Sequence, residues 1–256
     1  MAKNTVVWLC IFCCFGLVVS CTIKAAQTPN RLQPTPVPLP GGSTGIGFDD
    51  LGYSPDLKKV IVPAGRSGNL DLIDPKTLDI TAISGFSAQD KFGGGHGEGT
   101  TSADAGPNLL FATDHTKQQV DVVDPATRTI LTSAAVVDDP DYIRYVSNTN
   151  EVWVTQPDRD QIEVFSLADN QPPTLAHAAF IAVSGGPESL VIDKTHGRAY
   201  THLWDGKTVA IDTKHRTILA TWANGCAGSR GIALDEKRGF AFCLRAARKA
   251  KQLCWM

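Results

Sequence analysis

The sequence lacks both an excess of charge of one sign and the apolar periodicity of long helices. Its 256 residues include 26 acidic and 24 basic side chains, so the formal net charge is −2 and nothing indicates a nucleic-acid partner. No sustained 3.6-residue apolar period runs along the chain, which argues against helical repeats. Hydrophobic residues still make up 43% of the chain. These proportions predict a folded, soluble body of one large domain or two small ones.

Short motifs of catalysis and nucleotide binding are also missing from residues 45–243. The glycine run in "FGGGHGEG" is not followed by the Lys and the helix that a phosphate-binding loop needs. The same region contains no HExxH and no CxxC motif. We therefore predict no cofactor, with a divalent metal as the alternative, and the motifs do not predict an enzyme.

The N-terminal apolar run, Val6–Val19, is too short for a transmembrane helix. Its 14 residues fall short of the roughly 20 that cross a bilayer, but they suit the apolar part of a signal peptide over residues 1–20. The residues Val18–Cys21 resemble the lipobox of bacterial lipoproteins. This resemblance implies that Cys21 is acylated, so that the protein is periplasmic or on the cell surface and is anchored to a membrane by lipid. Plain secretion and a transmembrane anchor are the alternatives.

Proline and cysteine are unevenly distributed. Five of the 15 prolines lie between Pro29 and Pro40, so residues 21–44 are predicted to form a semi-rigid, extended spacer. Four of the seven cysteines lie within the first 21 residues, which leaves Cys226, Cys243 and Cys254. An odd number is unusual in an exported chain, and Cys226 is our candidate for a disulfide bond.

The body of the chain, residues 45–243, is internally repetitive. Each of the stretches "KVIVPAGRSGNLDLIDPKTLDI", "LLFATDHTKQQVDVVDPATRTI", "EVWVTQPDRDQIEVFS" and "RAYTHLWDGKTVAIDTKHRTI" contains two apolar strands and a polar turn, and a further short strand precedes each. The period is about 42 to 50 residues, enough for four short strands. Four complete units and part of a fifth predict an all-β fold, a β-propeller of four-stranded blades, with Trp153, Trp204 and Trp222 packed between blades. A two-sheet β-sandwich is the structural alternative.

Two stretches, "EVWVTQPDRDQIEVF" and "GIALDEKRGFAF", resemble the YVTN-type β-propeller repeats of bacterial surface and periplasmic proteins. The resemblance covers residues 45–243. It implies a ring of seven blades, within the roughly four to eight that propellers have, which serves chiefly as a binding or interaction platform for a protein or a small molecule. We therefore predict an exported, lipid-anchored binding module of unknown specificity.

The opening strands of the blades are the expected place for a site, because in a propeller they lie nearest the central channel. We align the five openings on Ser54, Ser102, Ser147, Asp193 and Asp235. Among the residues at one common phase, this alignment includes Gly97 and Tyr142. The candidate binding residues at the channel mouth are Asp49, His96, Glu98, Asp141, Arg144, Glu188 and Arg230. The alternative without a binding site is that these charged side chains are solvated or paired with one another, as Glu188 and Arg230 would be.

The segment "GGGHGEGTT" contains side chains that can ligate a metal or act in acid–base catalysis. His96 and Glu98 lie in a glycine-rich stretch whose backbone can approach a ligand closely. Together with Asp141 and Glu188 they would supply the imidazole and carboxylate ligands of a metal-assisted lactonase or other hydrolase in the central channel. This enzyme is the alternative to the binding module.

The last residues, 244–256, are basic and depart from the strand pattern. A C-terminal helix is one interpretation. The other is a frameshift, because in one of the other two frames Trp255 with Met256 can encode only Asp, and Cys254 with Trp255 only Leu. The tail can then read "SAGCPEGKAVVLD", which is similar to "WDGKTVAID" in the fourth unit. We therefore predict that the gene once encoded further blades, which the nucleotide sequence beyond codon 242 tests.

Overall fold

The structure is a computed structural model that describes residues 34–245 and 253–255. The chain divides into two compact units, Met1–Pro36 and Val37–Met256, and the strands belong to the second. The predicted signal peptide, Cys21 and most of the proline-rich spacer lie outside the described residues. Among the residues that the structure describes, no helical segment has the length and hydropathy of a membrane span.

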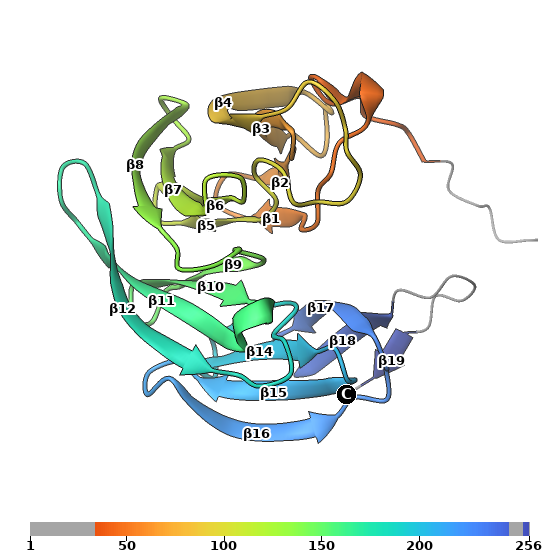
Figure 1. Ribbon diagram of the computed structural model, residues 1–256, viewed down its shortest axis with the longest axis vertical. Helices are drawn as coiled ribbons and strands as arrows, with labels where there is room; N and C mark the ends of the chain where they lie inside the picture. The colour runs from red at the N-terminus through yellow and green to blue at the C-terminus, as the bar shows by residue number, and fades with distance from the viewer. Residues whose placement is uncertain (1–33, 246–252, 256) are drawn as a thin grey trace, which may run out of the picture. The chain divides into compact units, whose positions relative to one another are not determined.

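The second unit consists of antiparallel sheets that follow one another along the chain, with the strands of each sheet in sequence order (Figure 1). We call these sheets blades 1 to 5. Blade 1 contains β1 (Gly52–Ser54), β2 (Lys59–Pro63), β3 (Ser67–Ile73) and β4 (Ile80–Ala88). Blade 2 contains β5 (Ala103–Gly106), β6 (Leu109–Asp114), β7 (Gln119–Asp124) and β8 (Thr129–Ala135). Blade 3 contains β9 (Ile143–Val146), β10 (Glu151–Gln156), β11 (Gln161–Ala168) and β12 (Thr174–Ala182).

Blade 4 contains β13 (Val191–Asp193), β14 (Arg198–Leu203), β15 (Lys207–Asp212) and β16 (Thr217–Ala223). Blade 5 contains β17 (Ser229–Asp235), β18 (Phe240–Arg245) and β19 (Leu253–Trp255). Two short 3-10 turns, η1 (Gly42–Thr44) and η2 (Pro157–Arg159), lie outside the sheets. Four sheets of four strands and one of three confirm the predicted propeller of four complete blades and part of a fifth, rather than a two-sheet sandwich.

The tight turn between the third and fourth strands of blades 1 and 2 is encoded by Asp-Pro-x-Thr. Asp74 Oδ1 accepts hydrogen bonds from the backbone N–H groups of Lys76 (2.8 Å) and Thr77 (3.2 Å), and Asp124 makes the equivalent bonds in blade 2. The proline that follows each Asp presets the turn dihedral. A hydrogen bond from Lys59, together with those from the backbone, lowers the pKa of Asp74 to about 2. Each turn thereby fixes where the fourth strand begins.

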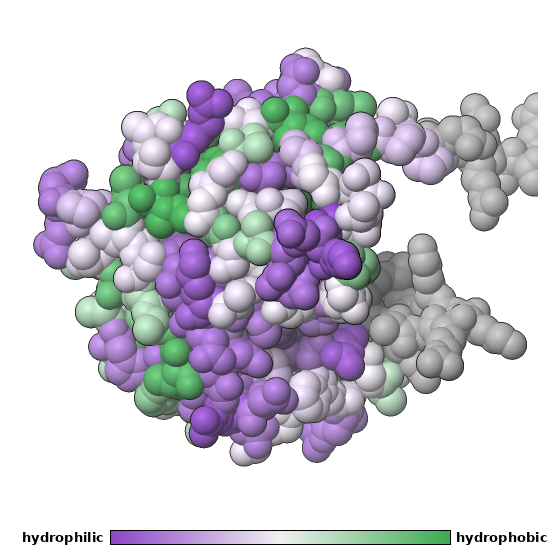
Figure 2. Space-filling model, turned by 45° about the horizontal axis from the view of Figure 1, so that its top comes forward, coloured by the Kyte–Doolittle hydropathy of each residue, from purple (hydrophilic) through white to green (hydrophobic). Residues whose placement is uncertain are grey.

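The hydrophobic core lies between successive blades. Leu70 of blade 1 packs in one cluster with Leu110 of blade 2. Phe111 of blade 2 stacks on Tyr145 of blade 3, with 5.6 Å between ring centroids, and Trp153 of blade 3 is fully buried in a cluster that continues into blade 4. On the face shown in Figure 2, the remaining hydrophobic residues lie in small groups among hydrophilic ones. Apolar burial is thus concentrated between the sheets.

The opening strands of successive blades, β1, β5, β9, β13 and β17, contact one another in that order. This arrangement agrees with the expectation that the first strand of each blade lies innermost. The segments that lead into these strands are therefore brought close together, although they lie far apart in the sequence. These segments carry most of the candidate site residues.

The third strand of blade 5, β19, pairs with β18 in antiparallel register. Residues 246–252 and Met256, which belong to the predicted out-of-frame tail, lie outside the described residues. The frameshift is a statement about the gene, and it stays a prediction.

Candidate functional site

The register of the sheets fixes which residues lie at the same position relative to the end of each opening strand. We call such a set of residues a level. Each opening strand ends where it pairs with the start of the second strand, at Ser54, Gly106, Val146, Asp193 and Asp235. The alignment on Ser102 and Ser147 is therefore wrong for blades 2 and 3, because their opening strands end at Gly106 and Val146 instead. In blade 2 the turn after the opening strand is also shorter, with Asn108 at a positive φ of 57°. This correction removes Gly97 and Tyr142 from the common level. The residues equally far before the strand ends are Asp49, Thr101, Asp141, Glu188 and Arg230.

Three side chains of types that can ligate a metal, two of them from this set, lie close together. Asp49 lies in the segment before β1, His96 in the glycine-rich loop between β4 and β5, and Asp141 in the segment before β9. One ligand atom of each lies within 4.8 Å of the other two. A glycine allows this approach, because a Cβ on Gly47 would lie 2.2 Å from the carbonyl oxygen of Gly95, the residue before His96. Asp49 and Asp141 are half-buried, whereas His96 is exposed, so solvent reaches the cluster from the imidazole side.

Burial dominates the electrostatics of the two carboxyl groups. It raises the pKa of Asp49, a change that the charge of His96 opposes and that of Glu188 reinforces. Burial, and then the negative charge of Asp49, raise the pKa of Asp141 well above its usual range. Two neighbouring carboxylates are costly as a pair of charges, so any positive charge bound between them is stabilised.

A cavity of about 160 Å³ lies next to the cluster. It is lined by His96, His115, Asp139, Asp141, Pro157, Asp158, Glu188, Trp204 and Arg230. Glu188, which is only 7% exposed, accepts hydrogen bonds from the indole N–H of Trp204 and the guanidinium of Arg230. The pairing expected of Glu188 with Arg230 is thus present. Asp139 and Asp158 are exposed at the rim, so negative charge exceeds positive charge around the cavity at neutral pH.

Sequence reasoning missed Trp204 as a site residue. The expectation that the tryptophans pack between blades is confirmed for Trp153, which is fully buried, but is wrong for Trp204, which is 45% exposed. Trp204 follows β14 in the polar turn "WDGK" and covers Gly186, where a Cβ would lie 3.0 Å from the indole ring. A tryptophan in a turn rather than in a strand was the available signal.

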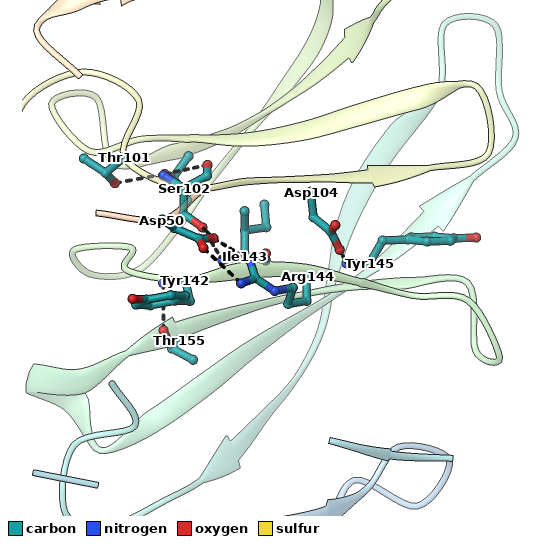
Figure 3. Close-up of polar contacts among 10 residues, drawn as sticks. Asp50, Thr101, Ser102, Asp104, Tyr142, Ile143, Arg144, Tyr145 and Thr155 are labelled. Carbon is teal, nitrogen blue, oxygen red and sulfur yellow. Dashed lines mark hydrogen bonds and ion pairs between the residues drawn. The ribbon is translucent and has the colours of Figure 1, made fainter. Parts of the chain in front are cut away.

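Arg144 lies away from the cavity, in a polar network that joins blades 1, 2 and 3 (Figure 3). Its Nη1 donates to Asp50 Oδ2 at 2.6 Å. The same oxygen accepts a hydrogen bond from Ser102 Oγ at 2.7 Å, and Ser102 Oγ accepts one from the backbone N–H of Ile143 at 3.1 Å. Arg144 lies in β9, and its guanidinium reaches between blades instead of toward the mouth. Its role here is structural.

Glu98 and Cys226 also differ from the rest of the candidates. Glu98 is half-buried and turns back toward the glycine run, where a Cβ on Gly93 would lie 3.3 Å from its Oε1. It belongs neither to the three-residue cluster nor to the cavity lining. The full ligand set expected for a metal-assisted hydrolase is therefore not gathered among the described residues, since Glu188 is also occupied by Arg230. Cys226 is buried and disulfide-bonded.

Comparisons with known proteins agree on the fold. No family model and no curated protein matches the sequence. A hydrazine synthase of Kuenenia stuttgartiensis matches with a TM-score of 0.58 and 11% identity, covering 90% of this chain and 69% of that chain. The β-propeller domain of Cps50 (Swd1) from Myceliophteria thermophila matches with a TM-score of 0.59 and 10% identity, covering 82% and 71%. The WD40 β-propeller domain of Doa1 matches with a TM-score of 0.56 and 12% identity, covering 79% of this chain and 66% of that chain. At such identities the likeness shows the β-propeller fold alone.

Proposed function

We propose that this protein is an exported, lipid-anchored β-propeller that binds a positively charged group of a protein or small-molecule ligand in the cavity beside Asp141. The observation that carries the proposal is a group of acidic side chains from blades 1, 3 and 4: Asp49 lies against Asp141, and Asp141 and Glu188 line the same cavity. The YVTN-type resemblance of the repeats supports a binding platform, and the signal-like N-terminus supports export.

A cation in the cavity would meet both negative charge and an aromatic surface. Asp139 and Asp158 lie at the rim and Asp141 in the wall. The indole of Trp204 is oriented by its hydrogen bond to Glu188 and is partly exposed. Attraction between a cation and such a ring contributes about 0.5 to 1 kcal/mol at an exposed site. A volume of about 160 Å³ suits a single ammonium or guanidinium group.

A trilysine peptide is expected to bind the full-length protein more tightly than a triglutamate peptide, with an affinity that falls as salt is added. Replacing both Asp139 and Asp158 by Asn is expected to weaken trilysine binding about twofold or more, because each exposed charge pair contributes about 0.2 to 1 kcal/mol. Isothermal titration calorimetry in the presence of a metal chelator measures both effects.

Asp205→Asn is the matched control for this experiment. Asp205 is an exposed acid next to Trp204, but it pairs with Lys207 and does not line the cavity. Its replacement is expected to leave the trilysine affinity unchanged. Equal binding of the two peptides, or equal loss in the control and the double variant, would contradict the proposed function.

Lipid anchoring makes its own prediction. Cys21→Ser is expected to abolish incorporation of labelled fatty acid and to leave the protein either unprocessed or released from the membrane fraction, because the acyl chains would be lost. Cys14→Ser, within the apolar run, is the control and should keep the label. A wild-type protein that takes up no label would refute the lipobox interpretation.

A further inference from the structure

We infer that the cluster beside this cavity binds one divalent transition-metal ion, held by the carboxylates of Asp49 and Asp141 and the imidazole of His96. The inference deepens the proposed function, because it rests on the same site and names a cation that binds there. The ligands come from the segment before β1, the loop before β5 and the segment before β9. A bound ion would therefore link blades 1 and 3 and the loop between blades 1 and 2.

The distances between the three side chains suit one ion. Their ligand atoms lie within 4.8 Å of one another. A metal with bonds of about 2.0 to 2.2 Å to nitrogen and oxygen holds its ligand atoms about 3 to 4 Å apart. Binding of the ion would require the exposed His96 side chain to rotate toward the two carboxyl groups, while its loop stays packed against Gly47.

Buried oxygens without donors point to a ligand between the two acids. Asp49 Oδ2 and Asp141 Oδ2 are both buried and receive no hydrogen bond from a third residue among those described, so the two carboxyl groups have only each other as hydrogen-bond partners. Asp50, by contrast, receives hydrogen bonds from Ser102 and Arg144. A buried carboxylate oxygen that lost its water without gaining a partner is costly, and coordination to a cation removes that cost.

The neighbouring basic side chains are already engaged elsewhere. The guanidinium of Arg230 is bound to Glu188, and that of Arg144 to Asp50. Among the described residues, neutralisation of Asp49 and Asp141 is therefore left to a proton that the two carboxyl groups share or to a cation from solution that displaces it. His96, exposed on the cavity side, provides the route by which such an ion enters.

The donor set selects the kind of metal. One imidazole nitrogen and two carboxylates suit Zn²⁺ and similar transition metals, whereas Ca²⁺ takes about six to eight oxygen ligands. Three protein ligands leave at least one coordination position open. That position faces the cavity, where water or a donor atom of a bound molecule would complete the shell.

Zn²⁺ titration of the chelator-treated, full-length protein tests the inference. Calorimetry and elemental analysis after dialysis are expected to give one tightly bound Zn²⁺ that depends on His96. His96→Ala is expected to weaken this binding about tenfold or more, because it removes one of three ligands. Co²⁺ serves as a second probe, since its visible absorption reports nitrogen and oxygen coordination and should be lost in His96→Ala.

His215→Ala is the matched control, because His215 is also exposed and lies 3.1 Å from a carboxylate oxygen of Asp212. It should keep the Zn²⁺ affinity and the Co²⁺ spectrum. Equal affinity in wild type and His96→Ala, or no Zn²⁺ uptake, would overturn the metal site. The trilysine titration separates the two proposals, because it is done in chelator: peptide binding without Zn²⁺ binding removes only the metal site, and failure of both removes both.

Discussion

Asp50→Ala is expected to lower the free energy of unfolding by about 3 to 5 kcal/mol, the cost of leaving one partner of a buried ion pair alone. Asp50 is 7% exposed, and its carboxylate accepts hydrogen bonds from Arg144 Nη1 at 2.6 Å and Nη2 at 3.2 Å. It also accepts one from Ser102 Oγ. Without it, the guanidinium loses its ion-pair partner and blades 1, 2 and 3 lose their shared polar link. Urea unfolding followed by circular dichroism measures the loss.

Two further variants separate charge from packing in this network. Asp50→Asn keeps an oxygen for Ser102 but removes the charge, so its loss should be smaller than that of Asp50→Ala. Asp50→Ala combined with Arg144→Met should recover part of the loss, because the guanidinium that Asp50→Ala leaves without its ion-pair partner is then removed. A cost below about 1 kcal/mol for Asp50→Ala would show that the network does not hold the three blades together.

The strands were predictable because the alternation and the Asp-Pro-x-Thr turns act locally. Asp74 caps its turn through its own backbone neighbours, so the sequence within that unit is sufficient. The site was harder, because its residues are positioned by register and by contacts between blades. The shorter turn at Asn108 shifts the alignment of blade 2, and repeat spacing alone does not reveal that shift.

Asp49 and Asp50 show why the sequence alone does not predict the direction in which a single side chain points. They are adjacent in the sequence, yet Asp49 joins the cluster with His96 and Asp141 whereas Asp50 joins the network between blades. Neighbouring residues in an extended segment point to opposite sides, and which side faces the cavity depends on how the segment docks. The orientation of His96 depends equally on its loop, whose Gly95 has a φ of 71°. Residue types and spacing do not encode either choice.

Asp71→Asn is expected to become more stable, compared with the wild type, as the pH rises from acid to neutral. Asp71 lies in β3 between its Cα partners Val62 of β2 and Ala82 of β4, and its side chain is fully buried. Neither carboxylate oxygen has a hydrogen-bond partner among the residues that the structure describes. Burial raises the pKa of Asp71 from 3.8 to about 6. The folded state therefore binds this proton more tightly than the unfolded state does.

The sign of the pH dependence follows from that order of pKa values. Between pH 4 and about 6 the unfolded chain releases the proton while the folded protein keeps it, so Asp71 lowers stability progressively over this window and by a constant amount above it. The full loss is about 2 to 3 kcal/mol. Asn does not titrate, so the difference in unfolding free energy between Asp71→Asn and wild type should rise by that amount from pH 4 to pH 8. Asp121→Asn should show a smaller rise, because Ser133 and Gln119 donate hydrogen bonds to the Asp121 carboxylate and favour its charged form. A difference that does not change with pH would mean that the Asp71 carboxyl group reaches water in the folded protein.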